Sequence, residues 1–227
     1  MASPLCLSSR TEQGACAMQK RSRSTREALV RAAVELVANG RLTDAGLVNI
    51  CNTAGVSRGA LYHHFSSIAE LVTEVYTQAQ GRVLALAEES LDSPGADAPA
   101  RFGIALGKAL AEDQLVRAGL RLAADGTDDP PRLREEVLDR LRVRILADAP
   151  DSPDRQVLAD LAVVVTAGLE SLGYADAVWW SPERGKRIWD RVLPLFEETG
   201  AGAEAGGAGR ERRASSQPPW DTAPGLP

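Results

Sequence analysis

Apolar residues recur every three or four positions through most of this 227-residue chain, which is the spacing of one face of a helix. No segment shows the strict alternation of apolar and polar residues that a half-buried strand requires. The pattern therefore predicts an all-α protein, followed by a disordered tail at 199–227 that is rich in Gly, Ala and Pro. A long helix is expected to open at Ser67, and further helices are expected near residues 99–111, 113–124, 130–148, 153–176 and 182–198.

The first helix is expected to begin at the capping box Ser24-x-x-Glu27, where the two side chains satisfy free backbone amides of the first turn. Apolar positions then mark one helix face as far as Gly40, which ends the helix. Residues 1–20 are polar, rich in serine and without periodicity, so we expect them to form a disordered leader.

A short second helix and a third helix follow, separated by a turn of three residues. Gly55 ends the second helix because glycine adopts the left-handed backbone most easily, and Ser57 is the N-cap of the third helix. Helix, short turn and helix together make a helix-turn-helix motif. The buried face of the second helix is expected to consist of Leu47, Ile50, Cys51 and Ala54.

The third helix has two different faces. Leu61 and Phe65 lie four residues apart and form the buried face. Arg58, Tyr62 and His63 point away from it. Arginine can read guanine in the major groove, while tyrosine and histidine donors suit phosphates. The exposed face therefore favours contact with DNA, although solvated residues without a partner would show the same pattern.

The charge distribution agrees with a nucleic-acid partner, in spite of a net charge of −5. Residues 1–67 hold 8 Lys and Arg against 4 Asp and Glu, a net charge of +4, whereas residues 68–227 carry −9. A basic end on an acidic body is expected where that end meets a polyanion.

Composition and motifs argue against other classes of protein. The chain has no run of 18 apolar residues and no apolar signal core at its start, so we expect neither a membrane span nor export. Its three cysteines cannot all pair, which indicates a reducing, cytoplasmic location. The two histidines, His63 and His64, diverge by about 100° on a helix and cannot bind one metal together. Without a nucleophile motif or a phosphate-binding glycine loop, we expect no catalysis, no cofactor and no metal.

The stretch AGVSRGALYHHF, residues 54–65, resembles the recognition-helix signature AGVSxGxLYxHF of the TetR family of one-component regulators. The resemblance implies a helix-turn-helix DNA-binding domain at 21–67 and a larger helical domain at 68–198 that binds a ligand and dimerises. It also implies that Tyr62 and His64 bind phosphates. The full set of implied DNA-binding residues is Ser57, Arg58, Gly59, Tyr62, His63 and His64.

Two positions depart from the residues usual in that family. Gly46 stands where a threonine commonly caps the second helix, and Ile68 stands where a lysine usually follows the aromatic residue. Both changes remove a contact with the DNA backbone. More of the affinity is then expected to come from Arg58 and from a basic arm, unless that arm is only solvated. The arm consists of Lys20, Arg21, Arg23 and Arg26.

A narrower resemblance concerns the γ-butyrolactone receptors of antibiotic-producing actinobacteria, and it rests on LVRAGLRLA (115–123), VVTAGLE (164–170) and KRIWDRVLPLF (186–196). It implies a small-molecule effector and a ligand-binding role for Thr166. The alternative is that the Thr166 hydroxyl bonds the carbonyl one turn back. The tryptophan that usually covers the ligand at the start of the seventh helix is missing, which favours the pseudo-receptor branch that answers antibiotics or biosynthetic intermediates.

Three further features each have two interpretations. Trp189, on the last expected helix, is expected to pack in a core or at a dimer face. Trp179 and Trp180 lie between the last two helices, either at an interface or in an exposed loop. Cys51 is expected to be a small core residue rather than a redox sensor.

The sequence thus predicts a homodimeric repressor that binds a pseudo-palindromic double-stranded operator and is released by a small molecule. Two alternatives stay open. A helical enzyme or metal protein would need a titratable cluster in the C-terminal part, which contains no histidine or cysteine. A helical protein-interaction module would use the helix-turn-helix only as a scaffold. The identity of the effector, the operator and the target genes do not follow from the sequence, and activation is not distinguished from repression.

Overall fold

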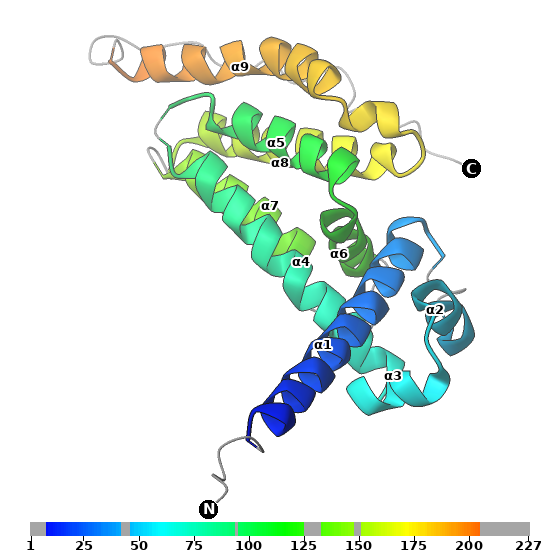
Figure 1. Cartoon of the computed structure of the whole chain (residues 1–227). Helices are drawn as coiled ribbons and strands as arrows, with labels where there is room; N and C mark the ends of the chain where they lie inside the picture. The colour runs from blue at the N-terminus through cyan, green and yellow to red at the C-terminus, as the bar shows by residue number, and fades with distance from the viewer. Residues whose placement is uncertain (1–7, 42–45, 94, 125–132, 148–150, 205–227) are drawn as a thin grey trace, which may run out of the picture.

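The structure is a computed structural model, and it describes residues 8–41, 46–93, 95–124, 133–147 and 151–204. This part of the chain folds into helices and short connections, without a strand, as the apolar spacing predicts (Figure 1). In chain order the helices are α1 (Ser8–Ala38), α2 (Leu47–Ala54), α3 (Arg58–His64), α4 (Ile68–Leu91), α5 (Ala98–Glu112), α6 (Gln114–Ala124), α7 (Leu133–Leu146), α8 (Pro153–Gly173), the 3-10 helix η1 (Ala177–Trp180) and α9 (Pro182–Glu204).

The helices α1, α2 and α3 share one hydrophobic core with the first turns of α4, at the lower right of Figure 1. Leu61 and Phe65 of α3 are buried in this core, as their spacing predicts. Cys51 of α2 is a buried free cysteine in the same core, which confirms its role as a small core residue. Other fully buried members are Leu29, Ile50, Leu71 and Val75.

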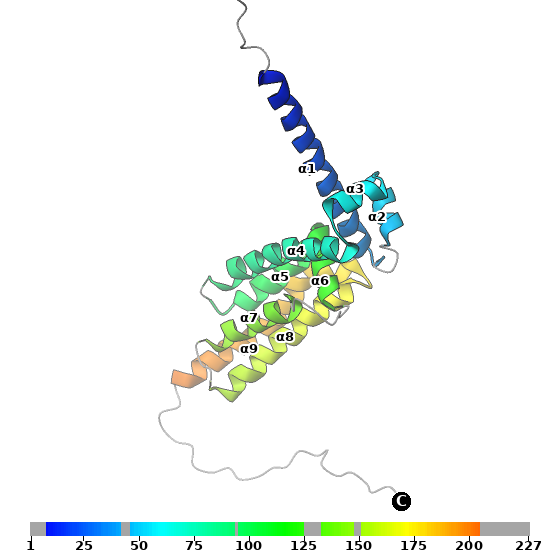
Figure 2. The same ribbon diagram turned by 90° about the horizontal axis from the view of Figure 1, so that it is seen from below.

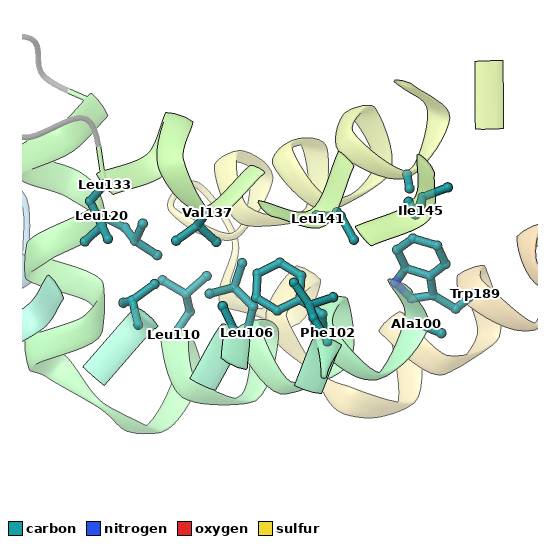
Figure 3. Packing of buried hydrophobic residues seen from close by; sticks show 14 of the residues in the cluster. Ala100, Phe102, Leu106, Leu110, Leu120, Leu133, Val137, Leu141, Ile145 and Trp189 are labelled. Atoms are coloured by element: carbon teal, nitrogen blue, oxygen red, sulfur yellow. The ribbon is translucent and has the colours of Figure 1, made fainter. Parts of the chain in front are cut away.

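The helices α4 to α9 enclose a second, larger core, and α4 contributes to both. Figure 3 shows Leu106 and Leu110 of α5 facing Val137 and Leu141 of α7, with Trp189 of α9 at one end. Trp189 is fully buried, so the expectation that it packs in a core is confirmed.

The helix α6 contacts both cores. Ala118 belongs to the first core and Leu120 to the second. One residue further along, Arg121 donates from Nη1 to the carbonyl oxygen of Ala38, over 3.3 Å. Its guanidinium carbon also lies 4.9 Å from the centroid of the Tyr174 ring. A positive charge at the last carbonyls of a helix is favourable, so Arg121 joins the C-terminal end of α1 to the residue that follows α8.

The start of α1 differs from the prediction. The helix begins at Ser8, and Ser24 lies inside it, so the expected capping box is not a helix start. A capping sequence sets the start only where the preceding residues do not continue the helix. Residues 8–23 contain no proline and are mostly good helix formers. The expected disordered leader, 1–20, is therefore helical from Ser8, and the first half of α1 projects away from the other helices (Figure 2). Likewise, α9 continues past the expected end at 198, and residues 205–227 of the expected tail lie outside the described residues.

The sequence does not predict η1, and this short helix places Trp180 in the core. Trp180 is 3% exposed, and its Nε1 donates to the backbone carbonyl of Glu170 at 3.0 Å. Neither the interface nor the exposed-loop interpretation is therefore correct for this residue. Gly173 makes the burial possible, because a Cβ at that position would overlap the indole. Trp179 is partly exposed, with the guanidinium carbon of Arg184 4.4 Å from its ring centroid.

The helix α8 is long and apolar enough to match a membrane span by length and composition alone. It packs, however, against α5, α7, η1 and α9. It also buries two polar residues, Thr166 and Glu170, which a lipid-facing helix would not hold among apolar neighbours. Its apolar character is thus explained by the core on one side, while Val157 and Val164 remain exposed on the other.

Candidate DNA-binding site

The turn between α2 and α3 is fixed by local hydrogen bonds. Gly55 adopts the left-handed conformation, with φ of 67°, and the amide of Val56 donates to the carbonyl of Cys51 at 3.0 Å. Ser57 then accepts a hydrogen bond from the amide of Ala60 at 3.2 Å, as the N-cap of α3. The predicted end of α2 and the predicted start of α3 are both confirmed, and the hydrogen bonds of this turn fix the direction of α3 relative to α2.

The outer face of α3 is exposed, as the spacing predicts. Ser57, Arg58, Gly59 and His63 are exposed, and 58% of Tyr62 is exposed. No hydrogen bond or ion pair ties the side chains of Arg58 and Tyr62 to other residues that the structure describes. This face therefore carries a free guanidinium and a free phenol on a rigid, buried support.

The two histidines occupy different environments. His64 is half-buried beside the core, while His63 is exposed, and their rings meet edge to face with centroids 5.2 Å apart. Burial lowers the pKa of His64, and the charges of His63 and Arg26 lower it further. His64 is therefore a neutral imidazole at pH 7, able to donate one hydrogen bond and to take up a proton near an anion.

Arg26 has a structural role that the sequence does not reveal. Its guanidinium makes two contacts with the Glu74 carboxylate, at 2.9 and 3.2 Å, and its carbon lies 4.9 Å from the centroid of the Phe65 ring. The hydrogen bond to Arg26 lowers the pKa of Glu74. Arg26 therefore holds α1 against α4 and covers the end of α3, and it is not a free member of the basic arm.

The remaining arm residues, Lys20, Arg21 and Arg23, are exposed on α1 ahead of the three-helix core. They belong to the regular helix α1, and not to the disordered leader that the sequence predicts.

The two departures from the family pattern are accommodated locally. Gly46 caps α2 through its carbonyl, which accepts from the amide of Asn49 at 2.9 Å, and no side chain takes part. Ile68 is half-buried and packs against the first core. Ile68, at the position where the family usually has lysine, thus anchors the start of α4 to the first core.

The start of α4 is capped twice. The hydroxyl of Ser67 accepts from the amide of Glu70 at 3.1 Å. The Glu70 carboxylate accepts from both the amide and the hydroxyl of Ser66, each at 2.6 Å. These hydrogen bonds to Ser66 lower the pKa of Glu70. The predicted helix start at Ser67 is therefore confirmed, and Ser67 and Glu70 form a capping box in which the carboxylate reaches Ser66, one residue before the N-cap.

Thr166 lies far along the chain from α3, in the core of the larger part. It is 2% exposed, and its Oγ1 has no hydrogen-bond partner among the described residues. The alternative in which the hydroxyl bonds the carbonyl one turn back is not what the structure contains. Nearby, Glu170 is 4% exposed and accepts from Nε of Arg134 at 2.6 Å. The sequence gives no signal for this buried pair, because the partners belong to different helices.

Comparison with known proteins identifies the N-terminal helices. Residues 29–75 match the family model of bacterial regulatory proteins of the tetR family. The HTH-type transcriptional regulator UidR of Escherichia coli strain K12 is 33% identical over 75 residues. These 75 residues are 33% of this chain and 38% of that regulator, so the match spans less than half of the curated relative.

Solved structures extend the likeness to the whole fold. A gamma-butyrolactone receptor described as an ArpA-like protein is 25% identical, with a TM-score of 0.56 over 78% of this chain and 98% of that chain. CprB from Streptomyces coelicolor, solved with its operator sequence, is 21% identical, with a TM-score of 0.63 over 83% of this chain and 100% of that chain. At 21% identity this second likeness shows the fold alone. Residues 29–75 are therefore the N-terminal domain of the TetR family of bacterial regulatory proteins, carried on a fold that TetR regulators share.

Proposed function

We propose that the protein is a ligand-responsive transcriptional repressor that binds a pseudo-palindromic operator as a homodimer. Residues 21–67 form its DNA-binding domain, and residues 68–198 form the domain that binds the effector and dimerises. The observation that carries this proposal is the capped, exposed face of α3, with unpaired Arg58 and Tyr62, inside a matched TetR domain.

DNA recognition follows from the direction of the side chains. Arg58 lies at the N-terminal end of α3, the end that recognition helices direct at base edges, and it reads guanine in the major groove. Tyr62 and His64 donate to phosphates, which position the helix on the duplex. Ser57, Gly59 and His63 complete the contact surface, with Gly59 allowing the backbone to approach closely. Exposed residues of the α1 arm add phosphate contacts.

The homodimer is supported by an apolar stripe along α8. Val157, Val164 and Leu172 are 66%, 66% and 46% exposed, and they lie on one side of the helix at intervals of seven and eight residues. Between them, a Cβ at Gly168 would meet no atom within 4 Å, so the backbone is open to a close partner. A second copy of α8 would bury this stripe, and two recognition helices would then enter successive major grooves about 34–36 Å apart.

Release by an effector needs a site in the larger part of the chain, and Thr166 with its unpaired hydroxyl supports one there. The effector is a γ-butyrolactone-like signal, an antibiotic or a biosynthetic intermediate, and the regulated genes serve secondary metabolism. The likeness to the ArpA-like gamma-butyrolactone receptor supports this choice. Such a regulator works in the cytoplasm, without a catalytic role. Effector binding favours a conformation in which the two recognition helices no longer match the groove spacing. The size of this shift is set by the ratio of the effector's affinities for the two conformations.

Binding to the protein's own upstream DNA, followed by gel shift over a salt series, tests the proposal. The affinity is expected to fall steeply with salt, because neutralised phosphates release counterions. Arg58→Ala and Tyr62→Ala are each expected to weaken binding by about 1–3 kcal/mol. Arg140→Ala removes the same charge from an exposed i,i+4 pair on α7 and is expected to leave binding unchanged.

Two results would contradict this assignment. Full binding by both α3 variants would show that another surface contacts DNA. Failure of the wild-type protein to bind either its upstream region or random genomic fragments at low salt would favour a helical protein-interaction module without specific DNA binding.

Operator affinity is also expected to rise as the pH falls from 7.5 to 6. The lowered pKa keeps His64 neutral in the free protein, and a neighbouring phosphate raises that pKa again, so binding takes up a proton. Each proton taken up per protomer changes the affinity by at most about tenfold per pH unit. Gel-shift titrations should give a flatter pH profile for His64→Gln than for the wild-type protein, while His63→Gln keeps most of the slope. Equal slopes for wild type and His64→Gln would contradict the phosphate contact.

The pH dependence of folding stability has the opposite sign to that of operator affinity. The pKa of His64 is lower in the folded state than in the unfolded chain, so folding stability falls as the pH drops below about 6.5.

A further inference from the structure

The last turn of α3 is held by Phe65, the residue that follows it. The Phe65 amide donates to the carbonyl of Leu61 at 2.9 Å, and the Phe65 side chain is buried in the first core. A helix of seven residues has little stability of its own, so its direction depends on how its two ends are fixed. Ser57 fixes the first end as the N-cap, and Phe65 fixes the second end.

A chain of side-chain contacts connects Phe65 to α1 and α4. The guanidinium of Arg26, on α1, lies over the Phe65 ring, with its carbon 4.9 Å from the ring centroid. Glu74, on α4, holds that guanidinium through two contacts, at 2.9 Å from Nη2 to Oε2 and at 3.2 Å from Nη1 to Oε1. Gln78 donates from Nε2 to the same carboxylate at 2.7 Å. The end of α3 is therefore held from α4 through a single side chain of α1.

The geometry of the pair between Arg26 and Glu74 suits orientation better than it suits DNA binding. Two parallel contacts fix the plane of a guanidinium as well as its position, and a lysine ammonium cannot reproduce them. The carboxylate also offsets the positive charge that would attract a phosphate. The two side chains are 43% and 29% exposed, so water screens their attraction and the geometric constraint is the main contribution of the pair.

We propose that Arg26 and Glu74 are positioning residues for the recognition helix: together they hold Phe65, and with it the orientation of α3 toward DNA, without touching the duplex. The inference rests on the proposed function, since it concerns how α3 is presented to the operator. It also separates two components of the affinity. Contacts with base edges depend on the direction of α3, whereas non-specific binding depends on the phosphate charges that the protein neutralises.

Glu74→Gln tests the inference, because charge and orientation predict opposite results. If charge alone mattered, removal of a carboxylate from the DNA-binding part would strengthen binding to a polyanion. We expect instead about fivefold weaker binding to the protein's own upstream DNA, the upper end of what a partly exposed ion pair contributes. Binding to a random-sequence duplex is expected to be unchanged or tighter, so the ratio of the two affinities falls. Glu136→Gln, which removes a paired carboxylate from α7, is expected to change neither affinity.

Arg26→Lys keeps the positive charge and removes the two-pronged contact with Glu74. Gel shifts are expected to show about fivefold weaker binding to the upstream DNA, with the wild-type slope of log affinity against log salt, because no phosphate contact is lost. Arg23→Lys makes the same exchange at an exposed position of α1 and is expected to keep wild-type binding. The double variant Arg26→Lys, Glu74→Gln is expected to lose no more affinity than either single variant, since both changes remove the same contact.

Hydrogen exchange on the DNA-free protein measures the positioning directly. The segment that contains the Phe65 amide, followed by mass spectrometry, is expected to exchange about fivefold faster in Glu74→Gln and in Arg26→Lys than in the wild type. The amides of α7 are expected to keep their exchange rates, which distinguishes a local change at α3 from a general loss of stability.

Other outcomes would overturn the inference. Tighter binding of Glu74→Gln to the upstream DNA would show that this carboxylate only repels phosphates. Wild-type affinity of Arg26→Lys would show that a positive charge at this position is sufficient. Unchanged exchange of the Phe65 segment in both variants would show that the pair does not hold α3. If the wild-type protein binds no DNA while the exchange rates rise as expected, the repressor assignment fails and the role of the pair in holding α3 stands.

Discussion

Val164→Glu is expected to give a folded monomer that no longer binds operator DNA. Val164 is 66% exposed in the single chain, so a carboxylate there remains solvated and the fold is retained. In a dimer joined through α8, the same carboxylate would be buried near its copy, without a counter-charge. Such burial is expected to weaken dimerisation by about 3 kcal/mol or more, at least about a hundredfold in Kd. Light scattering after gel filtration measures the oligomeric state, circular dichroism checks the fold, and gel shift measures operator binding.

Val143→Glu is the matched control for that variant. Val143 is 59% exposed and belongs to α7, not to the stripe on α8, and its replacement is expected to leave both the dimer and DNA binding intact. A dimeric Val164→Glu protein with wild-type operator affinity would rule out α8 as the dimer contact. A wild-type protein that is monomeric and still binds one operator with a sharp complex would rule out the homodimer itself.

Gly173→Ala is expected to destabilise the protein by about 3 kcal/mol, since the new methyl group would overlap the buried indole of Trp180. The indole cannot move aside easily. Its Nε1 donates a hydrogen bond to the carbonyl of Glu170. The Tyr174 ring meets it edge to face, with the ring centroids 5.1 Å apart, and the Arg117 guanidinium carbon lies 5.2 Å from the centroid of the indole. Urea unfolding at fixed protein concentration, followed by tryptophan emission, measures the loss in the free energy of unfolding.

Gly81→Ala is the control for backbone effects. Gly81 lies in the middle of α4, and a Cβ there would meet no atom within 4 Å. Alanine is expected to stabilise this helix by up to about 1 kcal/mol. A Gly173→Ala protein as stable as the wild type would show that Trp180 is not held where the structure places it.

The features that could be predicted from the sequence are those fixed by neighbouring residues. Ser57 and Ser67 each cap the helix that the sequence assigns to them, because the cap and the amide it satisfies lie three residues apart. The two faces of α3 follow in the same way, since Leu61 and Phe65 are one helical turn apart and define the buried side.

The features that could not be predicted depend on contacts between distant segments. Trp180 is buried because Gly173 leaves space and Glu170 offers a carbonyl, and neither fact is visible in the local pattern around residue 180. Arg26 looks like one more arginine of a basic arm until α4 brings Glu74 beside it. The predicted start of α1 was wrong for the opposite reason: a local signal at Ser24 was present, but the residues before it also favour a helix.

The position of Arg121 has a consequence for how an effector would be found. This one side chain touches the last turn of α1 and the residue that follows α8, so a shift of α6 changes both contacts together. If that shift connects effector binding to DNA release, thermodynamic reciprocity applies: operator DNA must weaken effector affinity by the same factor by which the effector weakens DNA affinity. A weak effector is then easier to detect on the DNA-free protein, and adding operator DNA to a bound effector should drive it off.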